Sequence, residues 1–189
     1  HTAAHPRPAT AGPRVGGVRR LGVIRASALG DFVHALPAFE ALRAAYPTAE
    51  IVLVGTPLHE ALLEGRPSPI DRVMVVPPGA IWHTGRALAG EGRSRPPAGS
   101  ARDIRPADVL ARLRAESFDL VIQLHGGGPE SNPVVRALGA RVTAGSATAD
   151  AATLDRIVPF EHYQSETART LEVVGLVGAA PVTIEPRLV

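Results

Sequence analysis

A short apolar strand that breaks into a loop of small residues and then into a helix constrains the fold of this chain most. Residues 21–24 form the strand, residues 25–30 form the loop, and apolar side chains recur at helical spacing from Phe32 to Tyr46. Asp31 stands at the junction of loop and helix. Proteins of the α/β class bind ligands and place catalytic groups at such strand-to-helix turns.

The same alternation of strands and helices continues along the chain. Strands are predicted at 50–55, 72–76, 119–122 and 141–144, and helices at 57–64, 107–116, 133–138 and 167–177. Such alternation implies parallel strands that are connected by crossover helices. Pro37, inside the first helix, is expected to kink it or to end a first short turn. We therefore predict an α/β fold with a Rossmann-like parallel sheet flanked by helices.

The pattern predicts one folded domain between two irregular ends. Residues 1–18 are rich in Pro, Ala and Gly and are predicted to be a disordered tail. Residues 19–181 are predicted to form the domain, in which residues 77–106 are a long mobile loop because Pro, Gly and Arg dominate there. Residues 182–189 resemble an interdomain linker or tail.

Composition argues against several function classes. The formal net charge is only +2, all 20 cationic side chains are Arg, and aromatic residues make up 4% of the chain, so a surface for binding nucleic acid is not predicted. The chain has no Cys, which excludes disulfides and thiolate metal ligands and favours the cytoplasm. No apolar run reaches the roughly 18 residues of a membrane span.

The loop after the first strand carries the first candidate site. Asp31 either caps the helix, as Asp often does, or acts as a base on a bound hydroxyl group. Arg25 is either a solvated charge at the strand end or a ligand for phosphate or carboxylate. Ser27 and Gly30 would let ligand atoms approach the backbone, although Ser27 is also a common turn residue.

A second candidate site follows the strand at 119–122. The segment 123–132 reads QLHGGGPESN, in which three glycines could expose backbone amides to an anion or a sugar, or could simply make a tight turn. It lacks the Lys of a phosphate-binding P-loop and the spacing of a dinucleotide fold. Trp82 could stack on a sugar ring or anchor its loop, and Glu166, Arg169 and Glu172 are interpreted as a solvated helix face.

Three segments resemble glycosyltransferase family 9, the family of the ADP-heptose:lipopolysaccharide heptosyltransferases. These are SALGDFVHALP at 27–37, QLHGGGPESN at 123–132 and LEVVGL at 171–176. The resemblance implies the N-terminal, acceptor-side half of a GT-B enzyme, which has two Rossmann-like domains. It implies Asp31 as the catalytic base of an inverting sugar transfer. It also implies acceptor-binding roles for a second set of residues, which are Arg25, Ser27, Gly30, His125, Gly126 and Asn132.

The resemblance also sets expectations for ligands and partners. The donor would be a nucleotide-sugar such as ADP-heptose and the acceptor a glycan or glycolipid, with a role in lipopolysaccharide biosynthesis. No obligatory metal or other cofactor is expected. The donor-binding half is missing, so it would be supplied in cis or by a complementing chain, and the isolated chain is expected to be inactive. The expected location is the cytoplasm, including the inner face of the cell membrane.

Two other functions stay open on sequence grounds. One is a non-catalytic binding or interaction module derived from such a transferase. The other is a nucleotide-binding Rossmann module, against which the loop at 26–30 argues because it lacks the dinucleotide glycine pattern. The sequence does not identify the acceptor or the sugar.

Overall fold

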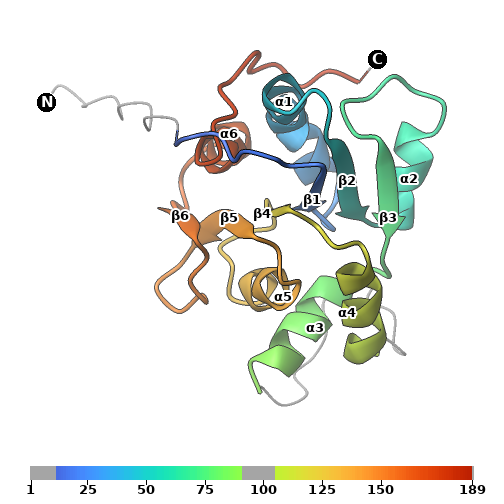
Figure 1. The fold of residues 1–189 in the computed structure, drawn as a ribbon, viewed down its shortest axis with the longest axis vertical. Coiled ribbons are helices and arrows are strands. Elements are labelled where there is room, and N and C mark those ends of the chain that lie inside the picture. The colour runs from blue at the N-terminus through green and yellow to red at the C-terminus, as the bar shows by residue number, and fades with distance from the viewer. Residues whose placement is uncertain (1–11, 91–104, 189) are drawn as a thin grey trace, which may run out of the picture.

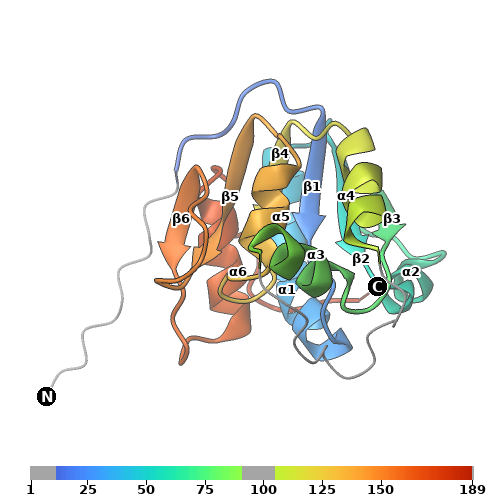
Figure 2. The ribbon, with the colours of Figure 1, turned by 90° about the horizontal axis from the view of Figure 1, so that it is seen from below.

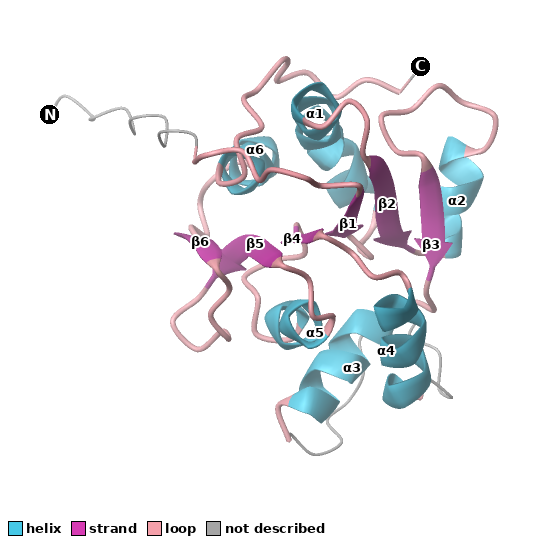
Figure 3. Ribbon diagram, in the orientation of Figure 1, coloured by secondary structure: helices cyan, strands magenta, loops and turns pink. Residues whose placement is uncertain are grey.

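The computed structural model describes residues 12–90 and 105–188, which form a six-stranded parallel sheet with helices on both faces (Figures 1 and 3). The strand order is β3-β2-β1-β4-β5-β6. The strands are β1 (Arg20–Ile24), β2 (Glu50–Gly55), β3 (Arg72–Val75), β4 (Leu120–Gln123), β5 (Val142–Ala147) and β6 (Arg156–Pro159). The helices are α1 (Leu29–Ala45), α2 (Pro57–Leu63), α3 (Ala80–Leu88), α4 (Pro106–Ala115), α5 (Ser131–Ala137) and α6 (Glu166–Gly175). The predicted fold class is confirmed.

The helices divide into two layers that sandwich the sheet. Helices α1 and α6 pack on one face and α3, α4 and α5 on the other, as Figure 1 shows. Each layer covers its own apolar cluster, the first built around Phe32 and Phe39 of α1 and the second around Leu113 of α4 and Phe118 just after that helix. The central strands are buried on both faces, which explains why they read as continuous apolar runs in the sequence.

The chain reverses its direction of winding between β1 and β4. The connection after β1 leads to α1 on one face, whereas the connection after β4 leads to α5 on the other. The two strands pair in parallel, with Ile24 opposite Gln123, so their carboxyl ends lie side by side. Figure 2 shows the sheet from the face that α3, α4 and α5 cover. Open α/β sheets bind ligands in the crevice at such a switch point.

Carboxylates hold the opposite, amino edge of the sheet. Asp71, Asp119 and Asp155 each stand one residue before a strand, and each accepts a backbone N–H from a neighbouring strand. The distances are 2.6 Å from Ile51 N, 3.0 Å from Arg20 N and 2.8 Å from Thr143 N. Asp119 accepts hydrogen bonds from two backbone N–H groups, those of Arg19 and Arg20, and these bonds lower the pKa of its carboxyl group.

An ion-pair network reinforces the same edge. Arg20, Glu50 and Arg72 begin the three neighbouring strands β1, β2 and β3, and Glu116 lies at the end of α4. Both arginines donate to Glu50 at 2.6 Å, and Arg72 also pairs with Glu116. The hydrogen bond from Arg72 lowers the pKa of Glu50. The network therefore links three strands and a helix through one cluster of charges.

The segment 12–18 is packed and not disordered, so that part of the predicted tail is wrong. Val15 is buried, and its N–H donates to the Tyr46 hydroxyl at 3.1 Å. Gly12 N–H donates to the Gly175 carbonyl at 2.8 Å. No local sequence pattern in residues 12–18 predicts that this segment packs against α1 and α6. Residues 1–11 lie outside the described residues, and residues 182–188 form neither helix nor strand.

Two further predictions of local structure are corrected. Part of the predicted mobile loop 77–106 is helical, because α3 packs against α4 and α5, and residues 91–104 lie outside the described residues. Pro37 does not end α1, which runs on to Ala45. Strand β6 was not predicted. It lies at the edge of the sheet, where only Val158 is buried, so it lacks an apolar run.

Gly85 of α3 marks the closest approach between α3 and α5. A Cβ atom at this position would lie 1.7 Å from the carbonyl oxygen of Glu130, just before α5. We expect Gly85→Ala to lower the free energy of unfolding by about 1–3 kcal/mol, because the two helices must separate. Urea denaturation measures the loss. The matched control is Gly175→Ala in α6, where nothing lies within 4 Å, and equal stability of the two variants would contradict this packing.

No helix in the described parts of the chain is both long and apolar enough to cross a membrane.

Candidate active site

Asp31 lies in the first turn of α1, at the switch point of the sheet. Helix α1 begins at Leu29 and its N-cap is Ala28, so Asp31 is the third residue of the helix. The interpretation of Asp31 as the N-cap is therefore wrong. Its side chain is exposed, and within residues 12–90 and 105–188 its carboxylate has no hydrogen-bond or ion-pair partner. A free carboxylate in this place is chemically able to accept a proton from a bound hydroxyl group.

Arg25 is buried behind this turn. Its residue exposure is 1%, which shows that the interpretation as a solvated charge at the strand end is wrong. One terminal nitrogen donates to the Leu124 carbonyl at the end of β4. The other donates to the Asp31 carbonyl at 2.7 Å and to the Glu166 carboxylate at 2.7 Å. The guanidinium thus joins the two loops of the switch point, and its contact with an acceptor stays a prediction.

The two other candidate residues of the first loop, Ser27 and Gly30, differ in exposure. Gly30 is exposed and nothing lies within 4 Å of the position where a Cβ atom would stand. Ser27 is partly buried, and its hydroxyl oxygen is buried without a partner among the described residues. The space beside Gly30 suits close approach by a ligand, and the binding roles of Ser27 and Gly30 stay predictions.

Side chains inside the protein fix the glycine loop after β4. The Gln123 amide nitrogen lies 2.9 Å from the His125 carbonyl and 3.0 Å from the Gly126 carbonyl. Ser146 of β5 also donates to the Gly126 carbonyl, at 2.7 Å. Gly126 itself is exposed and has φ +68, a left-handed conformation that favours glycine. The loop therefore presents Gly126 to solvent while its carbonyls bond inward, and binding by Gly126 stays a prediction.

Asn132 shapes this loop from within. Its side chain is fully buried, and its amide donates to the Ser146 carbonyl at 3.2 Å and to the Ala152 carbonyl at 2.9 Å. Asn132 therefore ties α5 to β5 and to the loop after it. The buried side chain offers no surface to an acceptor, which argues against the predicted binding role.

His125 is neutral at physiological pH. Burial and the nearby Arg25 guanidinium lower the pKa of His125 to about 4, while the Asp31 and Glu166 carboxylates act in the opposite direction. Its Nδ1 atom is buried without a partner among the described residues. A neutral imidazole close to the Asp31 carboxylate can donate or accept a hydrogen bond without adding charge.

The ion pairs of Glu166 and Arg169 behind the candidate site were not predicted from the sequence. The two side chains are only 23% and 11% exposed, and they pair with each other and, through Glu166, with Arg25. The interpretation of these two residues as a solvated helix face is wrong. The Arg169 guanidinium lies 4.3 Å from the centre of the Phe160 ring. A Glu-x-x-Arg pattern directly after the N-cap Ser165 was the signal available in the sequence.

Trp82 lies in helix α3. The indole is partly buried, and the Arg86 guanidinium lies 5.1 Å from its ring centre. The residue is thus part of a packed helix.

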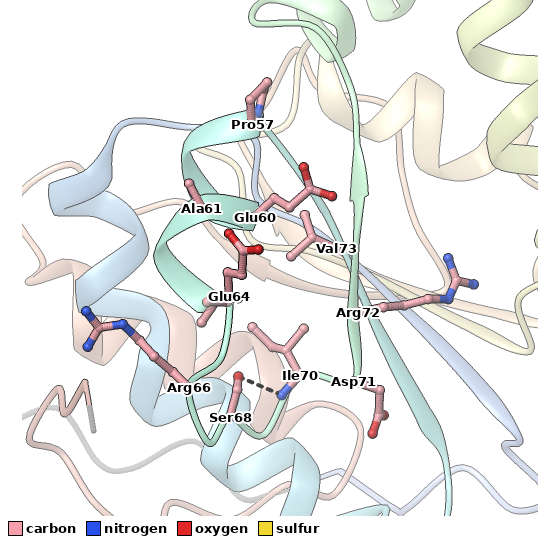
Figure 4. A pocket seen from close by; sticks show the side chains of 11 residues that line it. Pro57, Glu60, Ala61, Glu64, Arg66, Ser68, Ile70, Asp71, Arg72 and Val73 are labelled. Carbon is pink, nitrogen blue, oxygen red and sulfur yellow. Dashed lines mark hydrogen bonds between the residues drawn. The ribbon is translucent and has the colours of Figure 1, made fainter.

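A polar hollow lies apart from the switch point. It has a volume of about 470 Å³ and lies between α2 and β3 (Figure 4). Glu60, Glu64 and Arg66 line it, and two further charged residues, Asp71 and Arg72, are already engaged at the amino edge of the sheet. Among the described residues, no group of three or more His, Asp or Glu side chains could hold a metal ion.

Comparison with known proteins identifies the fold. No protein-family model and no curated protein sequence matches this chain. Among solved structures, a glycosyl transferase family 9 protein from Veillonella parvula superposes with a TM-score of 0.62 at 21% sequence identity, over 86% of this chain and 42% of its own. The heptosyltransferase WaaC of E. coli with ADP gives 0.59 at 20% identity, over 87% of this chain and 49% of its own.

A third solved structure agrees with these two. It is the ADP-heptose lps heptosyltransferase II of E. coli, which gives a TM-score of 0.56 at 14% identity, over 90% of this chain and 46% of its own. The chain spans about half the length of each of these structures. Its Rossmann-like fold is that of one half of a heptosyltransferase.

Proposed function

We propose that this chain is the acceptor-side half of an inverting glycosyltransferase of the heptosyltransferase type. The observation that carries the proposal is Asp31, an exposed carboxylate at the switch point of the sheet that has no partner among the described residues. The likeness in fold to heptosyltransferase structures supports the same reaction class. The resemblance of the segments 27–37 and 123–132 to glycosyltransferase family 9 supports it independently.

In the proposed reaction, Asp31 acts as the general base. Its carboxylate takes the proton from an acceptor hydroxyl as the hydroxyl oxygen attacks the anomeric carbon of the sugar. The bond from that carbon to the diphosphate breaks, and the nucleoside diphosphate leaves with the electron pair. Attack from the face opposite the leaving group inverts the configuration. A single base is sufficient for this step.

The donor is proposed to bind on a second domain, which lies in the same protein or in a complementing chain. The donor would be a nucleotide-sugar such as ADP-heptose, and the acceptor a glycan or glycolipid of lipopolysaccharide biosynthesis. The negative charge of the leaving diphosphate would be stabilised by that second domain. We propose a cytoplasmic location for the reaction, at the inner face of the membrane where a glycolipid acceptor would lie.

The product of the complete enzyme tests the reaction class. We expect incubation with ADP-heptose and a glycolipid acceptor to release ADP and to form a glycosidic bond of inverted configuration, as read from the anomeric coupling in NMR spectra. Release of ADP without a glycosylated product would indicate donor hydrolysis and contradict the proposal. Retention of configuration would contradict the single-base mechanism.

The isolated 189-residue chain is expected to bind the donor poorly and to turn over little or none of it. The physical reason is that the groups proposed to hold the diphosphate are not in this half. Calorimetric titration with ADP-heptose should give no measurable heat, whereas an acceptor glycan should shift the NMR signals of the loops at Gly30 and Gly126. Measurable transfer by the isolated chain would show that this half also binds the donor.

A further inference from the structure

The buried guanidinium of Arg25 joins the end of β1 and the start of α1 to two segments that are distant in the sequence. It follows β1 directly, and its side chain is 2% exposed. Its terminal nitrogens donate to the Leu124 carbonyl after β4, the Asp31 carbonyl in α1 and the Glu166 carboxylate in α6. A buried cation needs a compensating charge, all the more here because the Nε atom of Arg25 is buried without a partner among the described residues. Glu166 provides the compensating charge.

Glu166 is itself held in place from α6 and from the loop after β6. It is the first residue of α6, where the N-cap Ser165 accepts a hydrogen bond from Ala168 N–H at 3.2 Å. Its second carboxylate oxygen pairs with Arg169. Arg169 also donates to the Glu161 carbonyl at 2.7 Å. These contacts hold the Glu166 carboxylate in place independently of Arg25.

The contact of Arg25 with Asp31 is made to the backbone, which leaves the Asp31 carboxylate free. The first turn of α1 lacks a side-chain cap, because the N-cap is Ala28. Its first helical hydrogen bond runs from Phe32 N–H to the Ala28 carbonyl at 3.1 Å. The bond from Arg25 to the Asp31 carbonyl is thus an additional support for a turn that is otherwise weakly held.

We propose that Arg25 and Glu166 are a positioning pair, which sets the turn that carries Asp31 against the loop that carries His125. The inference rests on the role of Asp31 in the proposed function. Neither side chain touches the reacting atoms. The pair acts by fixing where the Asp31 carboxylate stands, and a displacement of about 1 Å at a reacting group can cost on the order of 100-fold in rate.

The test separates positioning from stability by comparing single and double variants. Glu166→Met leaves the buried Arg25 without its carboxylate and is expected to lower stability strongly, whereas Arg25→Met leaves Glu166 paired with Arg169 and should cost less. The double variant Arg25→Met/Glu166→Met removes both charges and should recover much of that stability. It should not recover the position of the turn, because the bond to the Asp31 carbonyl is still missing. Glu166→Gln, which keeps a hydrogen-bond acceptor, serves if a single variant fails to fold.

Two readouts report on position. Hydrogen exchange at Phe32 N–H should accelerate about tenfold or more in the Arg25 variant and in the double variant, which corresponds to one lost hydrogen bond from a charged donor. In the complete enzyme, kcat should fall on the order of 100-fold while KM for the donor stays unchanged. The matched control is Arg43→Met at the other end of α1, which breaks the ion pair with Asp71 and should change neither readout.

Two results would overturn the inference. One is unchanged exchange at Phe32 in the Arg25 variant. The other is recovery of kcat together with stability in the double variant, as expected of a purely structural pair. Failure of the proposed function would look different, because Asp31→Asn would then leave transfer intact while the exchange at Phe32 still responded to loss of Arg25.

Discussion

Asp31→Asn in the complete enzyme is expected to lower the rate of sugar transfer by about 10²–10⁴-fold, the contribution typical of a general base. Asparagine has nearly the same shape but cannot take up the proton. The effect on stability should be small, within about 0.5 kcal/mol, because the side chain is exposed and makes no hydrogen bond to a described residue. Transfer is measured by release of the nucleoside diphosphate, and stability by the melting temperature.

The control for this prediction is Glu40→Gln, which removes another exposed carboxylate from the same helix. It should leave both transfer and melting temperature unchanged. If Asp31→Asn retains full activity, the assignment of the base is wrong. If both variants lose activity equally, the loss reflects the charge of α1 and not a proton transfer by Asp31.

The free energy of unfolding is expected to fall by up to about 3 kcal/mol as the pH drops from 6.5 to 4, because of His125. The pKa of His125 is about 4 in the folded chain and close to 6.5 when the chain is unfolded. Between these values the unfolded state binds more protons, so acid favours unfolding. The stabilisation is complete above pH 6.5. Burial also lowers the pKa of His59, which acts in the same direction.

Urea denaturation between pH 7.5 and 4.5 measures this dependence. The lowered pKa values of Glu50 and Asp119 add to the loss only near the lower end of this window, as the pH approaches the ordinary values of 4.5 and 3.8 for these groups. His125→Gln should flatten the pH dependence, whereas His162→Gln, at an exposed position, should retain it. A wild-type slope in the His125 variant would show that this imidazole is not held neutral.

The strands and helices with strong apolar periodicity were predictable from sequence. Strand β2 was predicted with its observed bounds, and α1 with its buried face. Helix α3 was not predicted, because Gly85 is a poor helix former and is explained only by its contact with α5. Strand β6 was missed because an edge strand buries few side chains and Pro159 ends it.

The candidate site was only partly predictable. Local sequence was sufficient to single out Asp31 and the loop around His125, since both follow apolar strands. It could not show that Arg25 would be buried, because its partner Glu166 lies 141 residues further along the chain. Asn132 was expected to contact an acceptor, yet its amide is used inside the fold. The same types of polar residue hold loops in place and bind ligands, so the sequence alone does not separate the two roles.

The carboxylates at the amino edge of the sheet have a consequence for how such a chain can diversify. Asp71, Asp119 and Asp155 pin the register of the strands at the edge opposite Asp31. The exposed residues of the loops at the carboxyl edge are therefore relieved of that task and can be exchanged, unlike the buried Gln123 and Asn132, which hold the loop after β4. If the proposed function holds, exchange of the exposed residues after β4 is expected to alter acceptor recognition, whereas Asp119→Ala before β4 is expected to lower the free energy of unfolding, because two backbone N–H groups lose their partner.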